Sequence, residues 1–275
     1  MNDTISGSWQ EYLQSPRFDW VRRRTYLALD VPTWTQAQDL VELFGDAVRG
    51  YKVGLELFCG DGPMALRELH RRGKRVFLDI KLHDIPHTVA GAIRSVCVPG
   101  VEMVNVHTAG GREMLLAARE AVDILKEPPL LIGVTVLTSI NENLWHELGF
   151  TSLSETVSVM ARLSADCGLD GVVAAAIDVP RIRTVTPAHF ITVVPGIRPL
   201  GSAKHDQARS LTPGEALHLG ADRLVLGRAV TLVADKKKAL AGIWDEMNGV
   251  LQAQGDVNLS VQNPTPEGPR RGDAV

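Results

Sequence analysis

Residues 76–88 read VFLDIKLHDIPHT, a run that begins as a strand and ends in a polar segment containing proline. Successive side chains of a β-strand point to opposite faces. One face of this strand is purely apolar: Val76, Leu78 and Ile80. Because that face must pack against covering helices, we expect Asp79 and Lys81 to point the other way, into the mouth of a barrel. Opposite charges that lie within about 4–6 Å favour the ionised forms of both groups.

Further short apolar runs of the same kind occur along the chain, separated by longer helix-like segments. Their richness in Val, Ile and Leu is typical of parallel strands that helices cover. We expect strands at Thr25–Asp30, Tyr51–Leu55, Val76–Lys81, Met103–His107, Leu130–Val136, Gly171–Ala176, Phe190–Val194 and Arg223–Leu226. Eight strand–helix units favour a closed (β/α)8 TIM barrel, folded as a single α/β domain, over an open doubly wound sheet.

Sequence signals also mark where helices begin. Three segments pair a Ser or Thr with a Glu or Gln three residues later, which is the pattern of a capping box. These pairs are Thr33 with Gln36, Ser152 with Glu155, and Thr212 with Glu215. Each pair is expected to start one of the helices that cover the barrel.

The two ends of the chain fall outside the barrel pattern. Residues 1–22 are expected to form an N-terminal extension that packs a helix across the base of the barrel, and the barrel itself is expected to span residues 23–251. Residues 252–275 contain too few large apolar groups to offset the entropy lost on ordering. We therefore expect this C-terminal tail to be disordered.

The overall composition excludes several classes of partner. The chain has 275 residues, of which 45% are apolar and 22% are charged, and its formal net charge is −3. Its basic runs are short and scattered, so no nucleic-acid partner is predicted. No stretch of about 18 uninterrupted apolar residues is present, so no membrane partner is predicted.

The cysteines bear on the cellular compartment. Cys59, Cys97 and Cys167 lie far apart in the sequence and form no CxxC pair. Such a set is typical neither of a disulfide framework nor of a zinc site. It suits a reducing environment, and the first twenty residues lack the apolar run of a signal peptide. We therefore expect a cytoplasmic protein.

Polar residues gather where the predicted strands end. In a parallel barrel these carboxyl ends form the active-site face. The residues at or near them are Asp30, Lys52, Asp79, Lys81, His107, Thr138, Ser139, Pro195, Arg198, Gly227 and Arg228. Random placement would not put ionisable groups at the same end of so many strands, so this end is predicted to hold a site. The alternative for strand three is a salt-bridge network that only rigidifies the barrel, although such networks seldom stabilise more than apolar packing does.

The run LDIKLHDIPHT at residues 78–88 resembles the Asp-x-Lys-x-x-Asp signature of orotidine 5′-monophosphate decarboxylases. This signature alone is shared with related phosphosugar decarboxylases and aldolases. Further motifs that resemble the family follow in its order: LALD ending at Asp30, YKVG around Lys52, VNVHTAGG at 104–111, VTVLTS at 134–139, PGIRP at 195–199, Asp206–Gln207 and LGR at 226–228. The resemblance covers residues 25 to 245 and implies a (β/α)8 barrel that converts orotidine 5′-monophosphate to uridine 5′-monophosphate, the last step of de novo pyrimidine nucleotide synthesis.

The resemblance implies how the reaction would proceed. Lys81 would stabilise and then protonate the carbanion that remains at C6 of the pyrimidine when CO₂ departs. Asp79 would lie against the carboxylate of the substrate. Lys52 would link Asp30, Asp79 and the ribose hydroxyls. The family uses no cofactor and no metal, so none is implied here.

The resemblance also implies that the catalytic unit is a homodimer. Asp84, as a catalytic residue, and Thr88 would enter the site of the neighbouring subunit. His87, which lies between them, departs from the family pattern, where Asn is commoner, and we assign it no role.

Other residues are implied to bind the nucleotide. Thr138 and Ser139 would meet the edge of the pyrimidine. Arg198 would lie beside the phosphate loop, and Pro195 of the same motif is also expected to bind substrate. Gln207, Gly227 and Arg228 would hold the 5′-phosphate.

Two other functions remain open at this point. A keto-sugar-phosphate decarboxylase or hexulose-phosphate aldolase would share the Asp-x-Lys-x-x-Asp signature and would use Mg²⁺ to stabilise an enediolate, but is not expected to carry PGIRP followed by Asp206–Gln207. A catalytically inactive barrel that binds a nucleotide for regulation is the other alternative. The charged residues of the motifs are all present, which argues against such a loss of catalytic activity.

Overall fold

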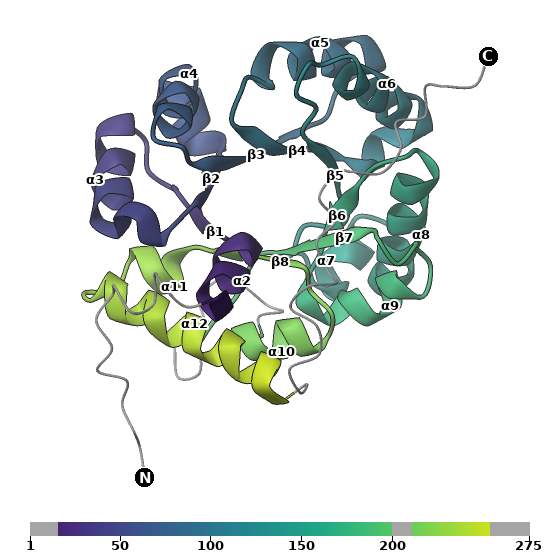
Figure 1. The fold of residues 1–275 in the computed structure, drawn as a ribbon. Coiled ribbons are helices and arrows are strands. Elements are labelled where there is room, and N and C mark those ends of the chain that lie inside the picture. Colours follow the sequence, from purple (N-terminus) through teal and green to yellow (C-terminus); the bar gives the residue numbers. More distant parts are fainter. Residues whose placement is uncertain (1–15, 200–210, 254–275) are drawn as a thin grey trace, which may run out of the picture.

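The computed structural model describes residues 16–199 and 211–253. Its strands form one closed parallel barrel in sequence order, in which β8 pairs with β1 (Figure 1). The strands are β1 (Thr25–Ala28), β2 (Gly50–Gly54), β3 (Arg75–Leu82), β4 (Val101–His107), β5 (Leu130–Val134), β6 (Gly171–Val173), β7 (Ile191–Val194) and β8 (Arg223–Leu226). The predicted (β/α)8 barrel is therefore confirmed.

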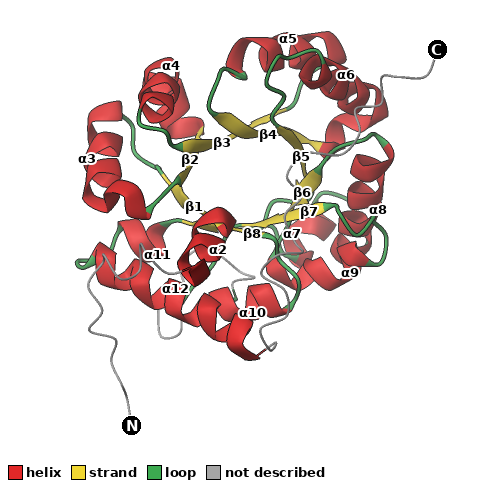
Figure 2. Ribbon diagram, in the orientation of Figure 1, coloured by secondary structure: helices red, strands yellow, loops and turns green. Residues whose placement is uncertain are grey.

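Helices surround the barrel and cover the outer face of its strands (Figure 2). They are α2 (Pro16–Arg24), α3 (Trp34–Phe44), α4 (Leu55–Arg71), α5 (Pro86–Val96), α6 (Gly111–Asp123), α7 (Glu142–Glu147), α8 (Leu153–Asp166), α9 (Val179–Arg183), α10 (Pro213–His218), α11 (Arg228–Thr231) and α12 (Lys236–Ala253). Short 3₁₀ turns are η1 (Gly45–Ala47), η2 (Thr108–Gly110) and η3 (Ala176–Asp178). Among the helices of the described residues, none has both the length and the apolar character that a membrane span requires.

The three predicted helix starts are confirmed. Thr33 and Ser152 accept hydrogen bonds from the main-chain N–H three residues later and so cap α3 and α8. At α10 the capping box is reciprocal, because Thr212 accepts from the N–H of Glu215 while the Glu215 carboxylate accepts from the N–H of Thr212 at 2.8 Å. These side chains bond main-chain N–H groups that have no partner within a helix.

Several strands end earlier than predicted. β1 ends at Ala28, two residues before Asp30, and β5 ends at Val134. Main-chain contacts nevertheless continue past these ends, since the N–H of Leu29 donates to the oxygen of Lys52 and that of Thr135 donates to the oxygen of Val173. The regular ladder therefore stops before the chain turns away, and the last residues of each run lie at the mouth of the barrel.

The core has an inner and an outer part. Inside the barrel, side chains from alternate strand positions form a cluster that includes Tyr26, Phe77, Met103, Ile132, Val173, Val193 and Val225. A larger cluster lies between strands and helices and includes Leu27, Leu78, Val104, Leu224 and Trp244. The two clusters are typical of a barrel whose strands alternate between a filled interior and a helical shell.

Charged groups close the amino-terminal end of the barrel. At the start of β3, the Arg75 guanidinium contacts the Glu102 carboxylate at 3.0 Å, and the Tyr26 hydroxyl donates to the same carboxylate. Arg75 also donates to the main-chain oxygen of Arg22 in α2. The ring of Phe18 packs edge-on against Trp244 of α12, with ring centroids 4.7 Å apart. Helix α2 thus lies across the base, opposite the mouth.

The domain limits expected from the sequence do not coincide with the ends of helices α2 and α12. The boundary after residue 22 falls inside α2, and residues 252 and 253 form the end of α12. Most of the expected extension, residues 1–15, and the rest of the expected tail, residues 254–275, lie outside the described residues.

Substitution of two glycines by alanine tests how closely β6 and β7 approach each other. A Cβ atom added to Gly171 in β6 would overlap the main-chain oxygen of Ile191 in β7, whereas one added to Gly242 in α12 would meet no atom within 4 Å. We expect Gly171→Ala to lower the free energy of unfolding by about 3 kcal/mol, because a main-chain atom cannot rotate away. Gly242→Ala should raise it by about 0.5–1 kcal/mol, because alanine favours the helix. Urea unfolding of both variants measures the difference, and equal stabilities would contradict the close strand contact.

Candidate active site

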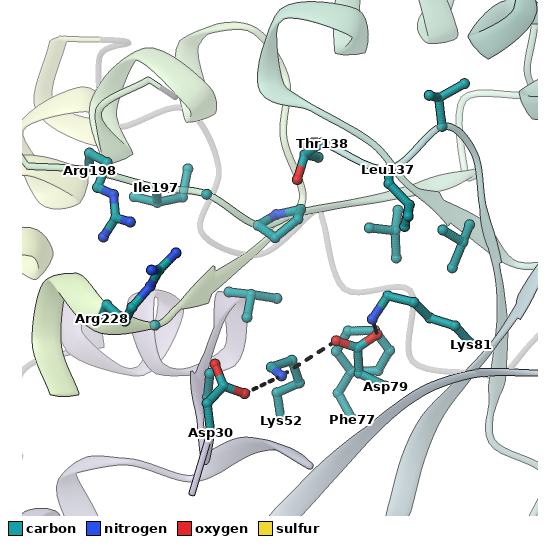
Figure 3. A pocket seen from close by; sticks show the side chains of 18 residues that line it. Asp30, Lys52, Phe77, Asp79, Lys81, Leu137, Thr138, Ile197, Arg198 and Arg228 are labelled. Carbon is teal, nitrogen blue, oxygen red and sulfur yellow. Dashed lines mark hydrogen bonds and ion pairs between the residues drawn. The ribbon is translucent and has the colours of Figure 1, made fainter. Parts of the chain in front are cut away.

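A cavity of about 230 Å³ opens where the strands end. Most of the residues predicted for the site line it: Asp30, Lys52, Asp79, Lys81, Thr138, Pro195, Arg198, Gly227 and Arg228. They come from the ends of β1, β2 and β3 and from the segments that follow β5, β7 and β8 (Figure 3). The barrel therefore brings residues that are far apart in sequence to one concave surface.

Lys52 lies between two carboxylates on the floor of the cavity. Its Nζ is 2.8 Å from Asp30 Oδ1 and 3.5 Å from Asp79 Oδ2 (Figure 3). Burial by itself would lower the pKa of Lys52, but the charges of Asp79 and Asp30 outweigh it and raise that pKa above its ordinary value. Lys52 is therefore a fixed ammonium group. A Cβ atom at Gly54 would lie 2.7 Å from Nζ, so the glycine leaves room for this side chain.

Lys81 places a second ammonium group on the other side of Asp79. Its Nζ is 2.6 Å from Asp79 Oδ1, and the two side chains remain 28% and 13% exposed to the cavity. Asp79 is thus held between two cations, and Lys52 between two carboxylates. A network that only rigidified the barrel would not need to face an open cavity, and this placement favours a site over that alternative.

The backbone of Lys81 is unusual. Its φ of +51° makes it the one residue other than glycine with a left-handed backbone among those that the structure describes. For a residue with a Cβ this conformation costs on the order of 1–3 kcal/mol. The β3–β4 register also shifts here, since Leu78 pairs with Val104 but Leu82 pairs with Val106. The prediction that alternation aims Asp79 and Lys81 at the mouth is confirmed, since both line the cavity while Val76, Leu78 and Ile80 pack in the outer core. The bulge at this point was not predicted.

Sequence reasoning missed Asn105, which is fully buried in β4. Its amide nitrogen donates to Asp79 Oδ1 at 2.7 Å, and its amide oxygen accepts from the N–H of Lys81 at 2.8 Å. A signal was present, since Asn105 alternates with Met103, whose side chain fills the barrel interior. Alternation along β3 also places Phe77 on the face of Asp79 and Lys81, and Phe77 lines the cavity.

Two arginines lie at the other end of the cavity. Figure 3 shows the guanidinium groups of Arg198 and Arg228 together, away from the Asp79–Lys81 pair. The Nε of Arg198 is buried and has no hydrogen-bond partner among the described residues. Gly196, with φ of +78°, and Gly227 supply main chain without a side chain beside them. Guanidinium groups next to accessible main-chain N–H groups are typical of a phosphate site.

A histidine pair borders the lysine end. The rings of His83 and His107 are 5.3 Å apart. Burial, followed by the nearby charges of His83 and Lys81, lowers the pKa of His107, and Asp79 opposes this only in part. A neutral imidazole is therefore favoured at His107 at neutral pH.

Some predicted site residues do not reach this cavity. Asp84 and Thr88 are exposed and do not line it, and Asp84 instead accepts a hydrogen bond from the N–H of Ile85. Ser139 is exposed as well, and of the Thr138–Ser139 pair only Thr138 lines the cavity. Gln207 lies outside the described residues.

The carboxylates of the cavity are already paired with cations. Both oxygens of Asp79 face ammonium groups, and Asp30 contacts Lys52. Within residues 16–199 and 211–253, no three His, Cys, Asp or Glu side chains are grouped as metal ligands. The side chains that could hold a ligand are thus two ammonium groups and two guanidinium groups, which suits an organic anion.

The chain is similar in sequence to known proteins over most of its length. The model of the orotidine 5′-phosphate decarboxylase / HUMPS family matches residues 24–243. An orotidine 5′-phosphate decarboxylase of Carboxydothermus hydrogenoformans is 45% identical over 83% of this chain and 97% of its own length. The enzyme of the same name from Moorella thermoacetica is 44% identical over 87% of this chain and 98% of its own.

The fold agrees with these matches. A crystal structure of orotidine 5′-phosphate decarboxylase from Lactobacillus acidophilus superimposes with a TM-score of 0.71 at 31% identity, covering 82% of this chain and 99% of that one. Sequence and fold thus point to the same group of proteins, over the same part of the chain that carries the cavity. The chain belongs to the orotidine 5′-phosphate decarboxylase / HUMPS family.

Proposed function

We propose that this chain decarboxylates orotidine 5′-monophosphate to uridine 5′-monophosphate, the last step of de novo pyrimidine nucleotide synthesis. The observation that carries the proposal is the Lys81 ammonium, which lies 2.6 Å from the Asp79 carboxylate at one end of the cavity. The relatives at 44–45% identity carry the name of this activity. The two arginines at the other end supply the second contact that a nucleotide monophosphate needs.

The chemistry requires a cation at the reacting carbon. Loss of CO₂ from C6 of a pyrimidine leaves a localised carbanion, because the ring offers no electron sink at that position. A positive group placed where the negative charge develops stabilises the transition state more than the ground state. Lys81 supplies that charge and is also the proton donor to C6. Asp79 lies against the departing carboxylate, and Lys52 binds Asp30, Asp79 and the ribose hydroxyls.

Lys81 alone cannot account for a large acceleration. An ammonium group roughly 4 Å from the carbanion contributes about 4 kcal/mol at an effective dielectric constant near 20. Enzymatic accelerations correspond to as much as about 23 kcal/mol. The remainder must come from binding the phosphate and ribose, which do not react but hold the ring in place. Arg198, Arg228, Gly227 and Gln207 are assigned to the phosphate, with Pro195 beside them.

The pyrimidine edge is assigned to Thr138. Of the two loop residues predicted for this contact, Thr138 lines the cavity, whereas Ser139 is exposed. We accordingly leave Ser139 without a contact to a substrate bound in this cavity. Thr138 follows β5 and lies across the cavity from the β3 pair, so it can approach the ring from the side opposite Lys81 (Figure 3).

The catalytic unit is proposed to be a homodimer. Asp84 and Thr88 are exposed outside the cavity of their own chain, and Ile85 between them is 65% exposed. An apolar side chain next to polar ones, just beyond the mouth, suits a contact with a second copy. In that dimer Asp84 and Thr88 enter the partner's site.

No cofactor or metal is included in this proposal, and the compartment proposed is the cytoplasm. Positive charge at the reacting carbon comes from Lys81, and the ammonium groups of Lys81 and Lys52 lie beside the Asp79 carboxylate that a metal would need. Cys59, Cys97 and Cys167 are free thiols, which suits a reducing compartment.

The first test is turnover by the unmodified protein. As orotidine 5′-monophosphate becomes uridine 5′-monophosphate, the absorbance on the long-wavelength side of the pyrimidine band should fall at the same rate with and without exhaustive chelation by EDTA. The charge that stabilises the carbanion belongs to side chains that EDTA does not remove. A requirement for Mg²⁺ would favour the enediolate chemistry of the related sugar-phosphate enzymes. Nucleotide binding without any turnover would favour the regulatory barrel.

Lys81→Ala should lower kcat by many orders of magnitude, because the lost group acts mainly on the transition state. Uridine 5′-monophosphate should still bind, since its phosphate contacts lie at the other end of the cavity. Calorimetric titration and thermal unfolding are the controls for binding and folding. A variant that kept even a hundredth of the wild-type kcat would show that Lys81 is not the proton donor.

Subunit mixing tests the placement of Asp84. Homodimers of Lys81→Ala and of Asp84→Ala should each be nearly inactive. In a hybrid dimer, one site carries both substitutions and the other carries neither, because Lys81 serves its own chain and Asp84 its partner. Random exchange makes about half of the dimers hybrid, so activity per site should approach roughly a quarter of wild type. A mixture that stays inactive would place Asp84 in its own subunit's site.

A further inference from the structure

Asn105 is a buried polar residue in contact with the reactive pair. Its side chain is fully buried in β4, and both ends of its amide are used. The nitrogen donates to Asp79 Oδ1 at 2.7 Å, and the oxygen accepts from the N–H of Lys81 at 2.8 Å. The same Asp79 oxygen is the one that contacts Lys81 Nζ. A single side chain therefore touches the carboxylate and the main chain of the lysine.

The β3–β4 register explains why a side chain is needed there. Between the pairs Leu78–Val104 and Leu82–Val106, three residues of β3 face the single residue Asn105. A regular ladder cannot pair every main-chain group across such a bulge. The N–H of Lys81 finds its acceptor in the amide of Asn105 instead, at the residue whose φ is +51°.

The two hydrogen bonds fix the orientation of the amide. A main-chain N–H requires an acceptor and a carboxylate requires a donor, so oxygen must face Lys81 and nitrogen must face Asp79. Asparagine is the side chain of this length that offers one of each. Aspartate would present an acceptor to Lys81 but a like charge to Asp79, and leucine would present neither.

We propose that Asn105 is a positioning residue for decarboxylation, which holds the Lys81 backbone in its left-handed turn and the Asp79 carboxylate beside the lysine ammonium. The inference rests on the function proposed above. It explains how a backbone conformation that costs free energy persists at Lys81, because the surrounding contacts must determine such a conformation. Asn105 does not line the cavity and acts through its two neighbours.

Two variants separate the two hydrogen bonds. Asn105→Leu removes both and keeps the number of side-chain heavy atoms, although its two methyl groups need more room than the amide. Asn105→Asp keeps the acceptor for the N–H of Lys81 and replaces the donor to Asp79 by a carboxylate. Thr192→Val is the matched control, because Thr192 is equally buried in β7 and its hydroxyl bonds Asp222 at 3.0 Å, among residues that do not line the cavity.

Asn105→Leu should lower kcat by about 100-fold, the scale of a misplacement near 1 Å. The KM for orotidine 5′-monophosphate and the Kd for uridine 5′-monophosphate should change by less than about threefold, because the phosphate contacts are intact. Thr192→Val should lose thermal stability with an unchanged kcat. A kcat of Asn105→Leu within threefold of that control would assign Asn105 to stability alone and overturn the proposal.

The pH dependence of Asn105→Asp supplies a readout that a purely structural role would not move. The new carboxyl faces the like charge of Asp79, which raises its pKa. Below that pKa it is protonated and its O–H can donate to Asp79 as the amide does. The ratio of its kcat to that of wild type should therefore rise as pH falls from 8 to about 5. A ratio that stays flat or falls would overturn the proposal.

Other titrating groups do not obscure this ratio. The titratable groups that interact with Asp79 or with one another there are present in both proteins: Lys52 in β2, Lys81 in β3, His83 just after β3, and His107 in β4. Wild-type turnover measured alongside separates the two hypotheses. Absence of wild-type turnover would refute the proposed function. Normal wild-type turnover together with an unchanged kcat of Asn105→Leu would refute only the role of Asn105.

Discussion

The site depends on one alternating row of charges: Asp30, Lys52, Asp79 and Lys81. Neighbouring parallel strands lie about 4.8 Å apart, so groups at adjacent strand ends can reach ion-pair distance. The strand register brings these charged groups together, because Lys52 pairs with Ala28 of β1 and Gly54 pairs with Asp79 of β3. Each inner group contacts two opposite charges, which keeps the Lys52 ammonium stable despite its burial. The row thus requires the parallel register of β1, β2 and β3.

The features that sequence could predict are those set by local pattern. Apolar runs and capping pairs identify the strands and the starts of α3, α8 and α10, because burial and main-chain N–H groups impose them directly. Parallel order then places the strand ends at one face, so Asp30, Lys52, Asp79 and Arg228 could be assigned to a common site. The ends of β1 and β5 were less predictable, since residues beyond them keep strand-like contacts after the ladder stops.

The remaining features arise from contacts between elements. A bulge between β3 and β4 leaves no trace in a regular alternation of residues, and a left-handed backbone at a lysine runs against its intrinsic preference. The pattern placed Lys81 in the cavity correctly, but it gave no sign that the N–H of Lys81 donates to the side chain of Asn105 on another strand. Likewise, the exposure of Asp84 and Ser139, and of Thr88 in the first turn of α5, depends on how the chain leaves each strand. Strand periodicity carries no information about that direction.

The proposed mechanism assigns phosphate binding to one end of the cavity and the chemical step to the other. The charge row holds two cations and two anions, so its net attraction for an anionic substrate is small. In the mechanism proposed above, the substrate carboxylate would lie against Asp79, which is unfavourable by itself because like charges repel. Attraction of the phosphate by Arg198 and Arg228 would offset this cost, and the repulsion would end when CO₂ leaves. Favourable binding at one end would then act mainly on the transition state at the other. A cavity with arginines at one end and the Asp79–Lys81 pair at the other therefore suits a substrate whose phosphate binds but does not react.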